Sequence, residues 1–171
     1  MGALGRCGKG ACDFAQAVGI PEEKIIRWDM AETKEGGPFP RILQSEIFVN
    51  CIYLNQPIPP FFTPAMLDEE RKMSVIVDVS CDTTNPHNPI PVYSVNTTFD
   101  KAVVEVVTKN SLPLDVCSID HLPTLLPRES SEAFSRDLLP TIIDLERRDQ
   151  SAVWGGAEAL FHGKVKSMKA L

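Results

Sequence analysis

The chain has 171 residues, the length of one ordinary domain or of one domain with a short appendage. Hydrophobic residues make up 43% and charged residues 23%, which is typical of globular proteins and excludes a disordered or fibrous chain. The formal net charge is −6 without any basic block, which argues against a surface for nucleic acid or anionic lipid. No apolar run approaches the ~20 residues of a membrane span, and we expect no secretory signal.

The amino-terminal part begins with a glycine-rich run over residues 2–10 and continues into an amphipathic helix that ends at Val18. Residues 24–29 then predict a short buried strand that stops at an acid. Glycine runs of this kind normally lie between a strand and a helix, where they let a phosphate approach the backbone. Since no strand precedes the run, we expect the chain to be a fragment whose first strand is missing.

Further apolar segments predict four more strands, at residues 47–54, 74–80, 102–107 and 114–119. Nearly continuous apolar runs favour a mainly parallel sheet that is covered on both faces. Helices are expected at 68–72, at 128–145 with an interruption at Pro140, and at 152–168. The alternation of strands and helices predicts an α/β fold.

The most informative pattern joins the glycines to Asp29. Gly2, Gly5 and Gly8 open a helix whose amino-terminal amides suit a pyrophosphate. Asp29 follows Gly8 by 21 positions (29 − 8), about the separation at which a dinucleotide fold places an acid on the adenosine ribose. Such an acid would repel a 2′-phosphate, so the pattern favours NAD over NADP.

Two other groups of polar residues lie where strands are expected to end. Asp78, Ser80 and Asp82 follow one apolar strand, at the edge where open α/β sheets bind ligands. Asp120 and His121 follow another strand. They could act as a catalytic pair, or they could be ordinary hydrogen-bonded loop residues.

The remaining reactive side chains are histidines and thiols. Neither His87 nor His162 has a second ligand at metal-binding spacing, so we expect no metal site. The cysteines are odd in number and include no C-x-x-C pair, which predicts reduced thiols and a cytoplasmic location; they are Cys7, Cys12, Cys51, Cys81 and Cys117. A disulfide between Cys7 and Cys51 is left open, and Cys7, at a helix start beside Arg6, is expected to react fastest.

Several segments together resemble fungal saccharopine dehydrogenases, the NAD-dependent, lysine-forming family. The most specific is Asp-Thr-Thr-Asn-Pro-His-Asn-Pro-Ile-Pro at 82–91, and the others lie at 2–8, 48–54, 77–80, 118–123 and 125–139. The resemblance implies oxidative cleavage of saccharopine to lysine and 2-oxoglutarate with NAD. It also implies two Rossmann-like domains with the active site between them.

The resemblance further implies roles for individual residues. Gly5 and Arg6 would lie against the pyrophosphate, and Asp29 and Thr33 on the adenosine side. Other implied contacts are Tyr53 and Val79 along the cofactor, Ile119, Asp120, His121 and Leu122 at the nicotinamide end, and Ser80 facing the substrate. The acid–base Lys and His of the family belong to an amino-terminal domain without a counterpart in this chain.

We therefore expect a truncated, Rossmann-like, NAD-binding domain over residues 1–125. A helical segment over 126–171 would pack toward the missing domain of the same enzyme. The alternatives are a non-catalytic nucleotide-binding or regulatory module, and a Rossmann dehydrogenase of another amino acid or hydroxy acid. The isolated chain is expected to be inactive.

Overall fold

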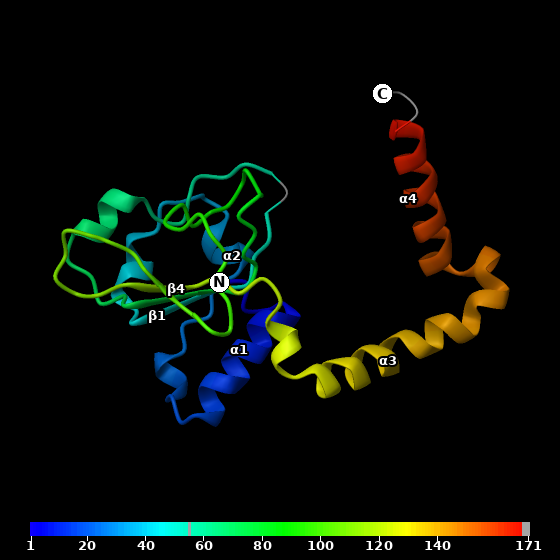
Figure 1. Ribbon diagram of the computed structural model, residues 1–171, viewed down its shortest axis with the longest axis horizontal. Coiled ribbons are helices and arrows are strands. Elements are labelled where there is room, and N and C mark those ends of the chain that lie inside the picture. Colours follow the sequence, from blue (N-terminus) through cyan, green and yellow to red (C-terminus); the bar gives the residue numbers. More distant parts are fainter. Residues whose placement is uncertain (55, 169–171) are drawn as a thin grey trace. The chain divides into compact units, whose positions relative to one another are not determined.

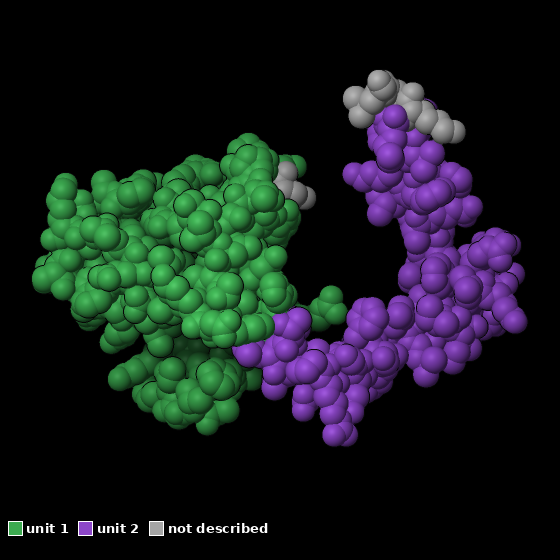
Figure 2. All heavy atoms as spheres, in the orientation of Figure 1, with its two compact units in different colours: residues 1–122 green, residues 123–171 purple. Residues whose placement is uncertain are grey.

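The computed structural model describes residues 1–54 and 56–168, which form two compact units (Figure 1 and Figure 2). The first unit, Met1–Leu122, contains a sheet with short helices around it, and the second, Pro123–Leu171, is helical in its described part. The boundary falls three residues before the predicted one, and the roles proposed for the two parts stay predictions.

The sheet of the first unit is open and mixed. Its strands are β1 (Ile47–Asn50), β2 (Val75–Asp78), β3 (Val104–Glu105) and β4 (Asp115–Cys117), in the order β1-β2-β4-β3. The β1–β2 and β2–β4 pairs are parallel, whereas β3 pairs with β4 in antiparallel fashion. The carboxyl ends of β1, β2 and β4 therefore meet at one edge of the sheet, where α/β proteins bind ligands.

The register of the sheet builds the core. Phe48 lies opposite Ile76, and Ile76 lies opposite Val116, so three apolar side chains point to the same face. All three are buried, and Phe48 makes edge-to-face contacts with Phe61 and Phe62 at ring-centroid distances of 6.3 and 5.8 Å. This packed layer fixes the strands whose ends carry the candidate site.

The first unit contains two α-helices and several 3₁₀ turns. Helix α1 (Arg6–Ala17) packs against β1 and is followed by Gly19, whose φ of 88° suits a residue without Cβ. Helix α2 (Met30–Thr33) is a single turn. The 3₁₀ helices are η1 (Glu22–Lys24), η2 (Pro40–Gln44), η3 (Pro64–Asp68) and η4 (Leu122–Leu125), the last of which crosses the unit boundary.

The described part of the second unit consists of consecutive helical segments. These are α3 (Pro127–Ile143), η5 (Asp144–Gln150) and α4 (Ala152–Met168). Pro140 lies inside α3 instead of ending it, and Trp154 of α4 donates its ring N–H to the carbonyl of Thr141 at 3.0 Å. Among the described residues, no helix is both long and apolar enough to cross a bilayer.

Two predicted elements are wrong. The strand expected at 24–29 is absent: η1 occupies its start, and Asp29 is already the N-cap of α2. The amide of Ala3 donates to the carbonyl of Trp28 at 3.0 Å, but a single main-chain bond does not make a ladder. The helix expected at 68–72 is also wrong, because η3 ends at Asp68 and an irregular segment follows.

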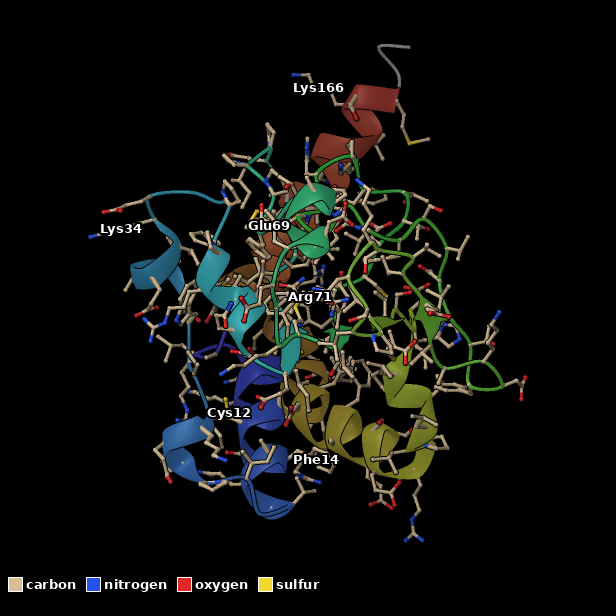
Figure 3. All side chains as sticks on the ribbon, turned by 90° about the vertical axis from the view of Figure 1, so that its left-hand side faces the viewer. Cys12, Phe14, Lys34, Glu69, Arg71 and Lys166 are labelled. Carbon is tan, nitrogen blue, oxygen red and sulfur yellow. The ribbon has the colours of Figure 1, made fainter. Side chains whose placement is uncertain are left out.

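The opposite, amino-terminal edge of the sheet is held by Arg71, which is 6% exposed (Figure 3). Its guanidinium and Nε donate to the main-chain carbonyls of Leu67, Met73, Leu112 and Pro113. One side chain therefore joins η3, the start of β2 and the loop before β4. Burial lowers the pKa of this guanidinium.

Candidate functional site

The glycine turn at the start of the chain is forced by close backbone contacts. Gly2 has a φ of 76°, and a Cβ at Gly8 would lie only 2.0 Å from the carbonyl oxygen of Gly2. Gly5 is the N-cap of α1 and makes no side-chain cap, so the first amides of the helix carry no side-chain acceptor there. Free amides at a helix start are suited to an anion such as a phosphate.

Asp29 lies beside this turn, as the sequence pattern predicts. Its Oδ2 accepts the amide hydrogen of Leu4 at 2.9 Å, and its Oδ1 accepts that of Met30 at the same distance. These hydrogen bonds, the one from Leu4 first, lower the pKa of the Asp29 carboxyl below its usual value. The carboxylate is partly exposed and retains lone pairs for the hydroxyls of a ligand.

Thr33 is the last residue of α2, and its hydroxyl donates to the carbonyl of Asp29 at 2.9 Å. Arg6 is exposed in the first turn of α1. The structure thus places Asp29 beside the turn that leads into Gly5 and Arg6, and Thr33 is bonded to Asp29.

A second cluster lies at the carboxyl ends of β1 and β2. Asn50 and Asp78 are the last residues of these strands and lie opposite each other in the register. The Asn50 amide donates to Asp78 Oδ1 at 2.9 Å, and the Tyr93 hydroxyl donates to Asp78 Oδ2 at 2.7 Å. The burial of Asp78 raises the pKa of its carboxyl, and the burial of Tyr93 raises the pKa of its phenol.

The predicted residues Tyr53, Val79 and Ser80 lie directly around this cluster. The amide of Val79 donates to the carbonyl of Asn50 at 2.9 Å, which extends the β1–β2 ladder by one step. Ser80 is half-buried and follows Asp78 by two residues, and its backbone offsets part of the rise in the pKa of that carboxyl.

The exposed Tyr53 reaches the other loop, where its hydroxyl donates to Asp82 Oδ2 at 3.3 Å. Asp82 Oδ1 accepts both the amide and the hydroxyl of Thr84, at 2.9 and 2.7 Å. Hydrogen bonds from Thr84 lower the pKa of the Asp82 carboxyl. This tyrosine–aspartate bond therefore joins the loop after β1 to the loop after β2.

The end of β4 carries the remaining predicted residues. Ile119 is 4% exposed and forms a parallel bridge with Thr97, so its side chain belongs to the core. Asp120 and His121 are exposed, and Leu122 is half-buried. The ring of Phe99 meets that of His121 edge to face, with centroids 6.0 Å apart.

Sequence reasoning missed three residues near these strand ends: Asn50, Tyr93 and Phe99. The available signal for Asn50 was a lone amide at the end of an apolar run, aligned with the acid that ends the next strand. Tyr93 and Phe99 follow long irregular loops, and only the fold brings their rings to this edge.

Other features of the described residues do not add a site. A shallow hollow of about 390 Å³ is lined mostly by apolar residues near η3 and the segment after β3, away from the predicted contacts. All five cysteines are free thiols. Among the described residues, no three His, Cys, Asp or Glu side chains are grouped to hold a metal.

A glycine turn at a helix start, followed by an acid beside it, is typical of α/β domains that bind dinucleotides. No protein-family model matches the chain. The chain is 64% identical, over 96% of its length, to "Saccharopine dehydrogenase [NAD(+), L-lysine-forming]" of Yarrowia lipolytica. It is 57% identical over 96% of its length to the protein of that name from Candida albicans, and 58% over 98% to that from Schizosaccharomyces pombe.

These comparisons confirm the resemblance inferred from the sequence. The chain covers 45%, 44% and 46% of these three relatives, so it spans less than half of their length. The relatives are, by name, NAD-dependent and lysine-forming enzymes.

Proposed function

We propose that this chain is the nucleotide-binding part of an NAD-dependent saccharopine dehydrogenase in lysine biosynthesis. The observation that carries the proposal is the identity of 64% to the Yarrowia lipolytica enzyme over 96% of the chain. The α/β architecture supports a truncated Rossmann-like domain, with two parallel strand pairs and a glycine turn before α1. Its compartment, in this proposal, is the cytoplasm, because five free thiols suit a reducing environment.

The proposed reaction oxidises the secondary amine of saccharopine. The carbon beside the nitrogen would lose a hydride, and water would then split the resulting C=N bond into lysine and 2-oxoglutarate. Bound NAD would supply the hydride acceptor. The residues of this chain would bind and orient the two reactants, while the proton-transfer groups would come from another domain of the longer enzyme.

The binding roles follow the geometry of the strand ends. Gly5 and Arg6 would hold the pyrophosphate at the start of α1, and Asp29 and Thr33 would hold the adenosine side. Support for this end comes from the uncapped amides of α1 and from the Asp29 carboxylate beside them.

The other end of the dinucleotide would lie along the carboxyl edge of the sheet. Tyr53 and Val79 would line its path, and Ser80 would face the substrate. At the nicotinamide end, the unburied side chains of Asp120, His121 and Leu122 would contact the cofactor. The side chain of Ile119 is buried, so Ile119 would contribute only its main chain.

The test is reconstitution of the activity from two parts. The chain is co-expressed with the part of the Yarrowia lipolytica enzyme that it does not match, and NADH formation is followed with NAD and saccharopine. We expect NADH to form with saccharopine, and not when another amino acid replaces it. Binding of NADH without turnover of any substrate would favour a non-catalytic module, and turnover of a different amino acid would favour another dehydrogenase.

A further inference from the structure

We propose that Asn50, Asp78 and Tyr93 act together as positioning residues that hold both loops of the nucleotide site in place. This inference rests on the proposed function and deepens it. None of the three side chains is offered as a contact to the nucleotide. They are called the buried triad below.

The buried triad joins three segments that are distant in sequence. Asn50 ends β1, Asp78 ends β2, and Tyr93 follows the proline-rich loop that Asp82 begins. Asn50 is 1% and Asp78 is 2% exposed, and Tyr93 is half-buried. Each carboxylate oxygen of Asp78 has its own donor: the Asn50 amide lies 2.9 Å from Oδ1, and the Tyr93 hydroxyl lies 2.7 Å from Oδ2.

Asn50 connects Asp78 to the loop after β1, because its amide group also bonds to the main chain of that loop. Its Oδ1 accepts the amide hydrogen of Ile52 at 3.2 Å, and its Nδ2 also lies 3.3 Å from the carbonyl of Ile52. Tyr53, the proposed cofactor contact, is the next residue. Because both ends of the Asn50 amide are used, the start of this loop has one defined geometry.

Asp78 and Tyr93 hold the loop after β2, because one lies at its start and the other at its end. Ser80, the residue proposed to face the substrate, follows Asp78 by two positions at the start of this loop, and its backbone offsets part of the rise in the pKa of the Asp78 carboxyl. Tyr93 ties the far end of the same loop back to Asp78, so the loop is held at both ends. The Asn85 amide also donates to the carbonyl of Leu54 at 2.8 Å and joins the two loops directly.

A purely structural role explains the triad less well. A carboxyl group placed in a buried position costs free energy of desolvation, and well-packed neutral groups often stabilise such a position at least as well. In keeping with this cost, burial raises the pKa of Asp78. What the carboxylate supplies is one acceptor oxygen for each of two donors, Asn50 and Tyr93, from two other segments of the chain, which is what joining the two loops requires.

The experiment compares two variants of the 171-residue chain. Tyr93→Phe keeps the ring and removes one donor from the buried triad. Thr108→Val is the matched control: it removes the hydroxyl that lies 3.3 Å from Arg71 Nη2, at the other edge of the sheet. Hydrogen exchange of single amides is measured by NMR, and the dissociation constant of NADH by its fluorescence.

We expect Tyr93→Phe to speed exchange of the Ile52 and Ser80 amides about tenfold and to weaken NADH binding about tenfold, because the variant loses one partly buried hydrogen bond to a carboxylate. Thr108→Val should leave those two amides and the NADH affinity unchanged. Should Tyr93→Phe not fold, Asp78→Asn, which loses one acceptor, gives the same comparison.

Unchanged exchange of Ile52 and Ser80 in Tyr93→Phe would overturn the inference, whatever happens to NADH. Faster exchange with wild-type NADH affinity would also overturn it, because the loops would then not depend on the triad for binding. If the unmodified chain bound no NADH, the proposed function would lose support, and the exchange result alone would decide whether the triad positions the loops.

Discussion

Gly8 and Gly10 lie two positions apart in α1 and differ in their surroundings. A Cβ at Gly8 would lie 2.0 Å from the carbonyl oxygen of Gly2, whereas a Cβ at Gly10 would meet nothing within 4 Å. We expect Gly8→Ala to lower the free energy of unfolding by about 3 kcal/mol, because backbone must shift to admit the methyl group. Gly10→Ala should raise it by about 1 kcal/mol through helix propensity. Urea denaturation followed by circular dichroism compares them, and equal effects would contradict the packing of the glycine turn.

The thiols also differ by position. Burial raises the pKa of Cys81 to about 11, so this thiol is protonated at neutral pH and inaccessible. Cys7 is exposed in the first turn of α1, and Cys117 is half-buried in β4. We expect Cys7 to be alkylated at least tenfold faster than Cys81 and Cys117, as followed by mass spectrometry. A Cys7 that reacts no faster than Cys117 in the folded chain would show the prediction to be wrong.

Asp29 is expected to set the choice of nucleotide. In the reconstituted enzyme, Asp29→Ala should raise KM for NAD about tenfold and change kcat less, because the carboxylate makes contacts that are equal in ground and transition states. The variant should also lose discrimination against NADP, whose 2′-phosphate an ionised Asp29 repels. Steady-state kinetics with both nucleotides measure this. An unmodified enzyme that used NADP as efficiently as NAD would contradict the role of Asp29.

The residues of the site were predictable where residue type and spacing follow a known pattern. The glycine turn and Asp29 were found because the glycines and an acid 21 positions after Gly8 match that of dinucleotide-binding folds, and the Leu4 amide does donate to Asp29. Asn50 and Tyr93 were not found, because no such pattern links them to Asp78, which lies 28 and 15 residues away. These partners are visible only after the strands are in register.

Arg71 links three elements at the amino-terminal edge of the sheet, through η3, the start of β2 and the loop before β4. We expect Arg71→Met to lower the free energy of unfolding by about 3 kcal/mol, because buried carbonyl oxygens lose their donors. Lys72→Met, at the exposed neighbouring position, serves as the control and should change it by less than about 0.5 kcal/mol. Urea denaturation gives both values, and similar losses in the two variants would refute the link.

The long carboxy-terminal helix was predicted correctly because a helix of this length satisfies its own backbone. The helix expected at 152–168 has those bounds as α4, because its hydrogen bonds lie within the segment. A strand depends on a neighbour instead. The apolar run at 24–29 has one main-chain bond to a distant segment, from the Ala3 amide to the Trp28 carbonyl, and forms no strand. Of the strand expected at 102–107, only Val104–Glu105 pairs with β4.

At the scale of the whole molecule, part of the outer edge of β1 is hydrogen-bonded to Met1. The Met1 amino group donates to the carbonyl of Val49 at 2.8 Å, and the amide of Cys51 donates to the carbonyl of Met1 at 3.1 Å. These two bonds follow the pattern of a parallel ladder. In such a ladder the amide and the carbonyl of one residue point to the same side of the strand, and those of the next residue point to the other side. The amide of Val49 therefore faces the outer edge, as its carbonyl does. A further strand along β1 would extend this ladder.

The described part of the second unit has exposed apolar side chains along both helices, including Phe134, Leu139, Ile143 and Phe161. Apolar surface of this kind commonly marks a contact surface. In the proposed enzyme, these helices would pack toward the domain that carries the proton-transfer groups. This assignment remains a prediction.

The 171-residue chain alone is expected to form no measurable NADH from NAD and saccharopine. Hydride transfer requires cofactor, substrate and a proton acceptor held together, and the proposal places the proton acceptor on another domain. Of the local side chains, His121 and Asp82 are the candidates for a substitute base. The carboxylate of Asp82 already accepts hydrogen bonds from Thr84 and Tyr53, and its lowered pKa makes it a weak base. His121 packs against Phe99 at the end assigned to the nicotinamide.

The measurement is absorbance at the NADH band with purified chain, first alone and then with the complementary part of the Yarrowia lipolytica enzyme. We expect a signal in the second case only, together with tighter NADH binding, since the added part would complete the site and cover the exposed edge of β1. Steady NADH formation by the chain alone would contradict the prediction. It would then make His121→Ala and Asp82→Ala the variants that identify the base, because whichever carries the proton transfer should abolish turnover while NADH still binds.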